Sequence, residues 1–157
     1  MRRKDREVTG VENLLEIIQD CAVCRLGMAD EGRPYVVPLN FGYEYRDDTL
    51  ILYFHGAREG KKIDILKKNN YACFEMDTAH QPTRGDRACN YGFNYASIIG
   101  FGTVEFIEEK AEKVRALNLL MKHQTGEDRD FTYPEAGLQA TAVYRLTAET
   151  FTGKRRS

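Results

Sequence analysis

Two short polar turns restrict the possible folds of this chain more than any other sequence feature. They occupy residues 30–33 and 46–48 and separate three predicted strands, 24–29, 35–45 and 49–55. The second and third of these strands are rich in Tyr, Val, Phe, Leu and Ile, which are residues that favour extended structure. Parallel neighbours would need crossover connections of about a dozen residues or more, so we predict an antiparallel meander.

A proline interrupts the second predicted strand. Pro38 has no backbone N–H and cannot donate to a strand ladder. We therefore expect this strand to lie at a sheet edge or to be bulged at Pro38. Either arrangement would leave backbone groups unpaired.

The rest of the chain mixes helical and extended patterns. Thr9 and Glu12 predict a capping box at the start of an amphipathic helix over 10–20. The further predicted elements are a helix at 60–69, a strand at 71–76, a polar loop at 77–94, a strand at 95–107 bent near Gly100 and Gly102, a helix at 108–123 and a strand at 139–147. Six mostly antiparallel strands with few helices predict a mainly β fold, a small β-barrel with added helices, built as a single domain over residues 1–157. No GxGxxG motif follows a predicted strand, which argues against a Rossmann dinucleotide site.

Composition and charge exclude several functional classes. The chain has 157 residues with 23 Lys and Arg against 24 Asp and Glu, and its longest apolar run, Leu50 to Phe54, is far too short for a membrane span. Residues 1–6 carry a net charge of +3, as do residues 154–157, so the body between them carries −7. An acidic body with basic ends is unlike a nucleic-acid-binding domain, and we interpret the ends as frayed and solvated. No apolar segment follows the basic N-terminus, so we expect a cytoplasmic protein that binds neither membranes nor nucleic acid.

Four cysteines raise the question of a metal site. Cys21 and Cys24 form one CxxC motif, whereas Cys73 and Cys89 lie 16 residues apart, with His80 between them. A zinc site needs a second close pair of ligands, so we expect free thiols and no metal. A Cys/His site that includes His80 remains the alternative.

One segment has the composition of a phosphate site. In His55-Gly56-Ala57-Arg58-Glu59-Gly60-Lys61-Lys62 a predicted strand ends, a glycine-containing turn follows, and a helix begins with two lysines. A helix N-terminus supplies amide donors, glycines allow close approach, and lysines supply positive charge. The alternatives are a solvated basic first turn and a structural, hydrogen-bonded histidine. The sequence contains no HExxH motif and no Ser/His/Asp pattern, so hydrolytic chemistry has little support.

Several motifs together resemble a known family. They are Pro34-Tyr35-Val36-Val37-Pro38-Leu39-Asn40-Phe41-Gly42, Tyr53-Phe54-His55-Gly56-Ala57-x-x-Gly60-x-Lys62, Asn69-Asn70-x-x-Cys73-Phe74, Tyr95-x-Ser97-x-Ile99-x-x-Gly102 and Thr152-Gly153-Lys154. The set is similar to the pyridoxamine 5′-phosphate oxidase-related FMN-binding split barrels, and within them to the nitroimidazole-resistance (Nim) branch. The resemblance spans nearly the whole chain.

The resemblance implies a six-stranded antiparallel split barrel that forms a homodimer and binds FMN at the subunit interface. It places the flavin ring against the backbone of one strand, made of Val37, Pro38, Leu39, Asn40 and Phe41. It places the flavin phosphate on four residues of the glycine-containing turn and helix start, namely His55, Gly56, Lys61 and Lys62. It also gives Ser97 a phosphate or ribityl contact, and His55 a candidate catalytic role.

Two departures from the family pattern narrow the expected function. Ala96 stands where many relatives have arginine, so either one phosphate-binding charge is missing here or Arg58 or Lys61 replaces it. No counterpart of the pyridoxal phosphate-binding residues is visible, so we do not expect pyridoxamine phosphate oxidation. We predict an FMN-dependent oxidoreductase that acts on a small electron-poor substrate such as a nitroaromatic compound, with NAD(P)H as candidate donor. The alternatives are a non-catalytic flavin storage or sensing module and a haem- or F420-binding relative.

Overall fold

A computed structural model of the chain describes residues 3–157. The strands are β1 Glu7–Val8, β2 Cys24–Asp30, β3 Arg33–Leu39, β4 Gly42–Arg46, β5 Thr49–Ala57, β6 Tyr71–Thr83, β7 Gly92–Ile107 and β8 Thr141–Arg156. The helices are α1 Val11–Asp20, α2 Lys61–Lys68, α3 Lys110–Thr125 and α4 Glu135–Ala140, with short 3-10 turns at Lys4–Arg6 and Ala88–Asn90. Among these residues no helix has the length and hydrophobicity needed to cross a bilayer.

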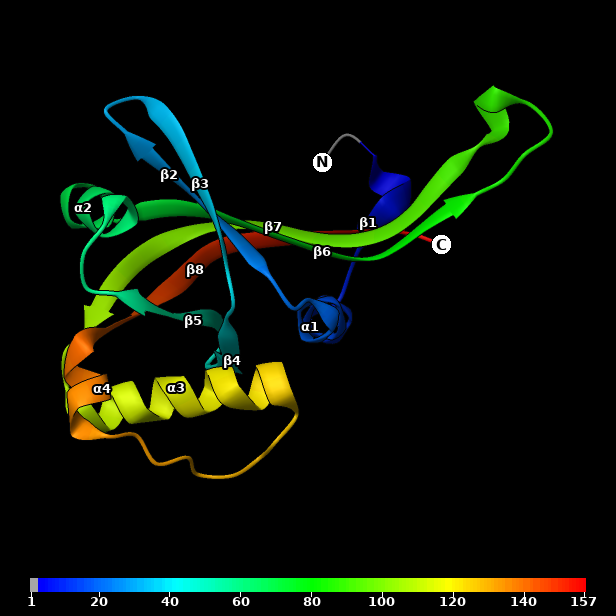
Figure 1. Ribbon diagram of the computed structural model, residues 1–157. Helices are drawn as coiled ribbons and strands as arrows, with labels where there is room; N and C mark the ends of the chain where they lie inside the picture. The colour runs from blue at the N-terminus through cyan, green and yellow to red at the C-terminus, as the bar shows by residue number, and fades with distance from the viewer. Residues whose placement is uncertain (1–2) are drawn as a thin grey trace.

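The strands form one antiparallel sheet in the order β3-β2-β6-β7-β8-β5-β4, with β1 added beside β8. β3 and β4 follow one another in sequence, yet they lie at opposite ends of this order, so the curled sheet stays open between them (Figure 1). The predicted mainly β split barrel is thereby confirmed. The sheet has eight strands rather than six, because the predicted strand 35–45 breaks at residues 40 and 41 and because β1 had not been predicted.

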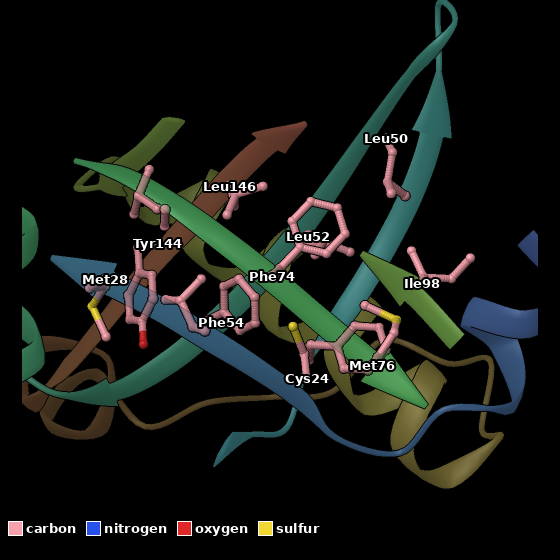
Figure 2. Close-up of a cluster of buried hydrophobic side chains, with 14 of the residues drawn as sticks. Cys24, Met28, Leu50, Leu52, Phe54, Phe74, Met76, Ile98, Tyr144 and Leu146 are labelled. Atoms are coloured by element: carbon pink, nitrogen blue, oxygen red, sulfur yellow. The ribbon is translucent and has the colours of Figure 1, made fainter. Parts of the chain in front are cut away.

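The core occupies the inner face of the curled sheet. Figure 2 shows its side chains meeting from β2, β5, β6, β7 and β8, with Phe74 and Tyr144 among the largest fully buried ones. On β5, Leu52 and Phe54 enter this core, whereas Tyr53 packs into a second cluster beneath α3 and α4. Burial on both faces explains the continuous apolar run Leu50–Phe54 within β5.

Three predictions were wrong: the capping box at the start of α1, the loop at 77–94 and the frayed C-terminal end. Gly10 caps α1 without any side-chain bond, and it is the backbone carbonyl of Thr9 that accepts a 2.8 Å bond from Asn13. The predicted loop 77–94 is mostly a hairpin arm, because β6 continues to Thr83 and β7 begins at Gly92 (Figure 1). Residues 154–156 are not frayed, since they pair with β7 along the end of β8.

The cysteines are free thiols in the described part of the chain. Cys21 and Cys24 are buried, and burial raises the pKa of Cys21 to about 12, so its thiol stays protonated at neutral pH. Within residues 3–157 no group of three His, Cys, Asp or Glu side chains could hold a metal ion, and this includes the Cys/His site suggested for His80.

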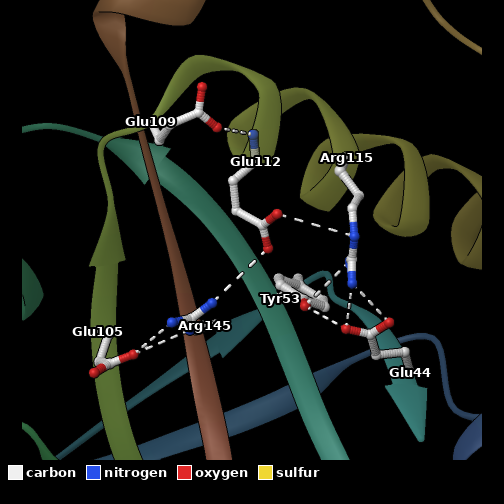
Figure 3. Close-up of polar contacts among 7 residues, drawn as sticks. All are labelled: Glu44, Tyr53, Glu105, Glu109, Glu112, Arg115 and Arg145. Atoms are coloured by element: carbon white, nitrogen blue, oxygen red, sulfur yellow. Dashed lines mark hydrogen bonds and ion pairs between the residues drawn. The ribbon is translucent and has the colours of Figure 1, made fainter. Parts of the chain in front are cut away.

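An ionic network fastens α3 to the outer face of the barrel (Figure 3). Arg115 donates to both carboxylate oxygens of Glu44, at 2.6 and 2.8 Å, and the Tyr53 hydroxyl donates to the same carboxylate at 2.6 Å. Burial and the nearby Glu44 carboxylate raise the pKa of Tyr53, which keeps the phenol protonated. The start of α3 is fixed by Glu109, which accepts from the amides of Ala111 and Glu112.

Replacing Arg115 with alanine should lower the free energy of unfolding by about 2 kcal/mol. The change leaves a mostly covered Glu44 carboxylate without its bidentate partner, although partial exposure of the pair reduces the loss below that of a fully buried one. Urea denaturation of the two proteins measures the difference. Lys122 lies on the same helix as Arg115 and forms an exposed ion pair with Asp128 in the loop that follows. Lys122→Ala should therefore change the free energy of unfolding by less than about 0.5 kcal/mol. Equal losses of stability in the two variants would show that the Arg115–Glu44 pair contributes no more to folding than an exposed ion pair does.

Candidate functional site

The first part of the candidate site is the free edge of β3. This strand pairs with β2 alone, with Pro38 opposite Arg25, so its other edge carries backbone groups that have no sheet partner. The position of Pro38 on an edge strand is confirmed. Val37 and Leu39 direct their side chains toward the core, so at these two positions the strand offers only backbone groups to its surroundings.

Asn40 and Phe41 lie just beyond β3 and are already engaged. The Asn40 side-chain amide donates to Gln124 at 2.9 Å, and the Phe41 carbonyl accepts from Gln124 at 3.0 Å. The Phe41 ring is fully buried. The side chains of these two predicted cofactor residues therefore serve the fold, and what they could offer a ligand is mainly backbone.

The second part is the corner between the end of β5 and the start of α2. A Cβ atom added at Gly56 would lie only 3.0 Å from Lys62 Nζ, so the lysine ammonium rests directly against the Gly56 backbone. Gly60, with a φ of +125°, caps α2, and its carbonyl accepts from the amides of Ile63 and Asp64. The first-turn amides of Lys61 and Lys62 have no acceptor within the helix and are available to an anion.

The two lysines of this corner have different surroundings. Lys61 Nζ lies 3.4 Å from Asp30 Oδ2 and 4.9 Å from the centre of the Tyr35 ring, which brings the start of α2 beside β3. Lys62 has no ion-pair partner among residues 3–157 and is partly covered. Lys62 is therefore the free positive charge of the corner, and Lys61 is mainly a link between α2 and β3.

His55 faces a different side of β5 from Gly56. Side chains alternate along a strand, and His55 lies on the same face as Tyr53, toward α3 and α4. There it lines a cavity of about 240 Å³. The other lining residues are Leu117, Leu120, Met121, Tyr133, Pro134, Gly137, Leu138 and Thr141. The sequence had not indicated these walls, because residues that line a cavity on a helix have the same apolar pattern as residues that fill a core.

The surroundings of His55 lower the pKa of its imidazole. His55 is exposed at the surface, but its partial burial against the cavity wall lowers its pKa, and the positive charge of Lys62 lowers it further. The lowered pKa favours the neutral ring at pH 7, and the ring makes no hydrogen bond within the described chain. Because the folded state favours the neutral ring, its contribution to stability is lost as the pH falls below the unfolded pKa of about 6.5.

Replacing Lys62 with methionine should raise the pKa of His55, since the substitution removes a neighbouring positive charge but keeps the bulk of the side chain. A ¹H–¹⁵N NMR titration of the three histidines measures this directly. The pKa of His123, which is lowered by burial and is not influenced by Lys62, serves as the internal reference. A His55 titration that is unchanged in the variant would show that Lys62 does not act on the ring.

Ser97 does not join His55 and the Gly56–Lys62 corner within one chain. On β8, Ser97 is opposite Lys154 and His55 is opposite Val143, so the two lie at opposite ends of that strand. Eleven residues of strand correspond to about 36 Å of contour length. Ser97 and the Gly56–Lys62 corner thus face different regions of the molecule.

Comparison with known proteins identifies the family. A protein-family model described as pyridoxamine 5′-phosphate oxidase matches residues 11–155 of the chain. The chain belongs to this family. A search of curated proteins gave no match.

Solved structures agree with this family assignment and also indicate the branch of the family to which the chain belongs. A candidate 5-nitroimidazole antibiotic resistance protein from Bacteroides thetaiotaomicron is 35% identical, with a TM-score of 0.82 over 95% of this chain and 86% of that one. This similarity places the family member in the nitroimidazole-resistance-like branch. An FAD-binding protein from Mesorhizobium loti is 26% identical, with a TM-score of 0.66 over 97% and 98% of the two chains. The flavocytochrome Anf3 from Azotobacter vinelandii, at 21% identity, has a TM-score of 0.81 over 100% of this chain and 72% of its own, and shares the fold.

Proposed function

We propose that this family member is a homodimeric FMN-dependent oxidoreductase that reduces a small electron-poor substrate, such as a nitroaromatic compound. The observation that carries the proposal is the Lys62 ammonium, which rests on the Gly56 backbone at the start of α2 without an ion-pair partner in residues 3–157. A cation at a helix N-terminus opposes the helix dipole, so this arrangement favours a bound anion. The FAD-binding relative supports a flavin as the source of that anion.

The corner fits a single terminal phosphate. It offers one free lysine and the first-turn amides of a short helix, a set that matches the ribityl phosphate of FMN. The unpaired edge of β3 lies beside it through the contact of Lys61 with Tyr35, and its backbone groups suit the polar edge of the flavin ring. We therefore favour FMN over the larger dinucleotide, and over haem, as the cofactor.

The homodimer is supported by the position of Ser97 and by an exposed apolar face. Because Ser97 is far from the corner in its own chain, it would reach a flavin phosphate from a second copy. A surface made of Val36, Tyr71, Ile99 and Phe101 is between 42% and 59% exposed, which is typical of a protein interface. Tyr71 and Phe101 stack within it, with ring centres 6.5 Å apart.

In this proposal each group has one task. Bound FMN would supply electron transfer between NAD(P)H and the acceptor. Lys62 and the first-turn amides would bind the phosphate, and the β3 edge would orient the ring. His55, neutral and free of hydrogen bonds in the described chain, would donate a hydrogen bond to the substrate, or would relay to it a proton that the ring first accepts from solvent.

A visible absorption spectrum of the purified protein, with mass spectrometry of the released small molecule, tests the proposal. Flavin bands and the mass of FMN are the expected result, whereas a Soret band would indicate haem. Bleaching by NAD(P)H and reoxidation by a nitroimidazole would distinguish an enzyme from a flavin storage module. A colourless protein that does not take up added FMN would refute the proposal.

Lys62→Ala should weaken FMN binding by about 1–2 kcal/mol, the scale of a lost charge-assisted hydrogen bond. Quenching of FMN fluorescence during titration of the protein measures the change. Lys67→Ala, on the exposed last turn of the same helix, is the matched control and should bind FMN as the parent does. Unaltered FMN affinity in the Lys62 variant would remove this residue from the site.

A further inference from the structure

The last turn of α3 ends at the break between β3 and β4. There the side chain of Gln124 uses both ends of its amide. Its nitrogen donates to the carbonyls of Phe41, at 3.0 Å, and Ala22, at 3.2 Å, while its oxygen accepts from Asn40 at 2.9 Å. One side chain therefore joins the end of β3 to the segment that leads into β2.

His123 strengthens the same junction by packing. Its Nε2 lies 2.8 Å from the carbonyl oxygen of Cys21, and because a carbonyl only accepts, this nitrogen is the donor. The ring packs against Phe41 with centres 4.5 Å apart and meets the Tyr43 ring edge-on at 5.3 Å. The end of α3 is thus both packed and hydrogen-bonded against residues 40–43.

This junction matters because β3 is held by a sheet neighbour on one side only. An edge strand is hydrogen-bonded to the sheet on one side only, and Pro38 donates no backbone bond, so β3 has fewer hydrogen bonds to fix its position than a central strand has. Gln124 supplies anchoring bonds immediately after Leu39, where the ladder to β2 ends. The position of the free edge is therefore set partly from α3.

We propose that Gln124 is a positioning residue for the flavin ring, acting through the backbone of residues 39–41. The inference rests on the proposed FMN site, in which this edge orients the ring. Gln124 would not touch the flavin. It would hold the edge in the geometry that the ring requires, so that less of the binding free energy is spent on ordering the strand.

A comparison of FMN with riboflavin tests this role, because riboflavin has the same ring but no phosphate. Gln124→Met keeps the length of the side chain and removes its hydrogen bonds, and it should weaken both ligands by the same factor, about tenfold. Lys62→Ala should instead weaken FMN and leave riboflavin unchanged. Lys122→Ala, two residues earlier and directed to Asp128, is the control and should leave both affinities unchanged.

The titrations are made well below the melting temperature of each variant, so that a loss of stability alone would not alter the affinities. Gln124→Glu provides a second test, because it keeps the acceptor for Asn40 but cannot donate to the two carbonyls. This variant too should lower the affinities for FMN and riboflavin by the same factor. Unchanged riboflavin affinity in both variants, or a loss confined to FMN, would overturn the inference. If the parent protein binds neither ligand, the proposed function itself fails.

Discussion

Replacing His55 with alanine is expected to lower the turnover of the proposed reaction about a hundredfold, with the flavin content of the protein unchanged. The cavity at His55 is walled mainly by leucine, methionine and proline, and its other polar side chains are already engaged. The Tyr133 hydroxyl bonds to Asn118 and the Thr141 hydroxyl to the Gly137 carbonyl. His55 is left to interact with a substrate there, and a positioned acid or base typically contributes 10²–10⁴-fold in rate, of which about a hundredfold is the lower limit.

Steady-state reduction of a nitroimidazole by NAD(P)H, normalised to bound flavin, measures this effect. His55→Gln is the informative control, because it retains a hydrogen-bond donor but cannot transfer a proton. If the glutamine variant recovers most of the turnover, His55 acts by hydrogen bonding; if it is as slow as the alanine variant, proton transfer is the role. Normal turnover in His55→Ala would show that the histidine is structural.

The parts of the fold that depend on neighbouring residues could be predicted from the sequence. The turns at 30–33 and 46–48 fix the β2–β3 and β4–β5 hairpins, and Pro38 indicates an edge strand. The long arm formed by β6 and β7 was missed because its polar residues resemble a loop. What makes it extended is cross-strand pairing, such as that of Pro82 with Phe93, between residues whose partnership is not evident from local sequence.

In the candidate site, too, contacts between residues close in sequence could be predicted, whereas contacts between distant residues could not. Gly56 and Lys62 are six positions apart, so a strand, a turn and a helix start already bring them close. Gln124 meets Asn40 and Phe41 from more than eighty positions away, and only the packing of α3 on β4 makes that contact. The distance of Ser97 from His55 likewise follows from the register on β8, which no local pattern reveals.

Substitution of Gly42 by alanine should lower the free energy of unfolding by about 3 kcal/mol. A Cβ atom at this position would lie 2.4 Å from the backbone nitrogen of Leu120 and 2.5 Å from its Cα, so it would overlap the main chain of α3. A helix backbone cannot yield as a flexible side chain does, and α3 would have to move away from β4. For a domain of this size the loss corresponds to a decrease in melting temperature of about 10 °C, which calorimetry measures.

Gly137→Ala is the matched control for this prediction. Gly137 lies in α4, and a Cβ atom there would meet no atom within 4 Å, so the change should be neutral or stabilise the helix by up to about 1 kcal/mol. Displacement of α3 should also pull Gln124 from the Phe41 carbonyl, so Gly42→Ala should bind riboflavin less tightly than the parent at temperatures where both are folded. A Gly42 variant as stable as the Gly137 variant would mean that α3 and β4 are not in backbone contact, and the link from this helix to the free edge of β3 would lose its physical basis.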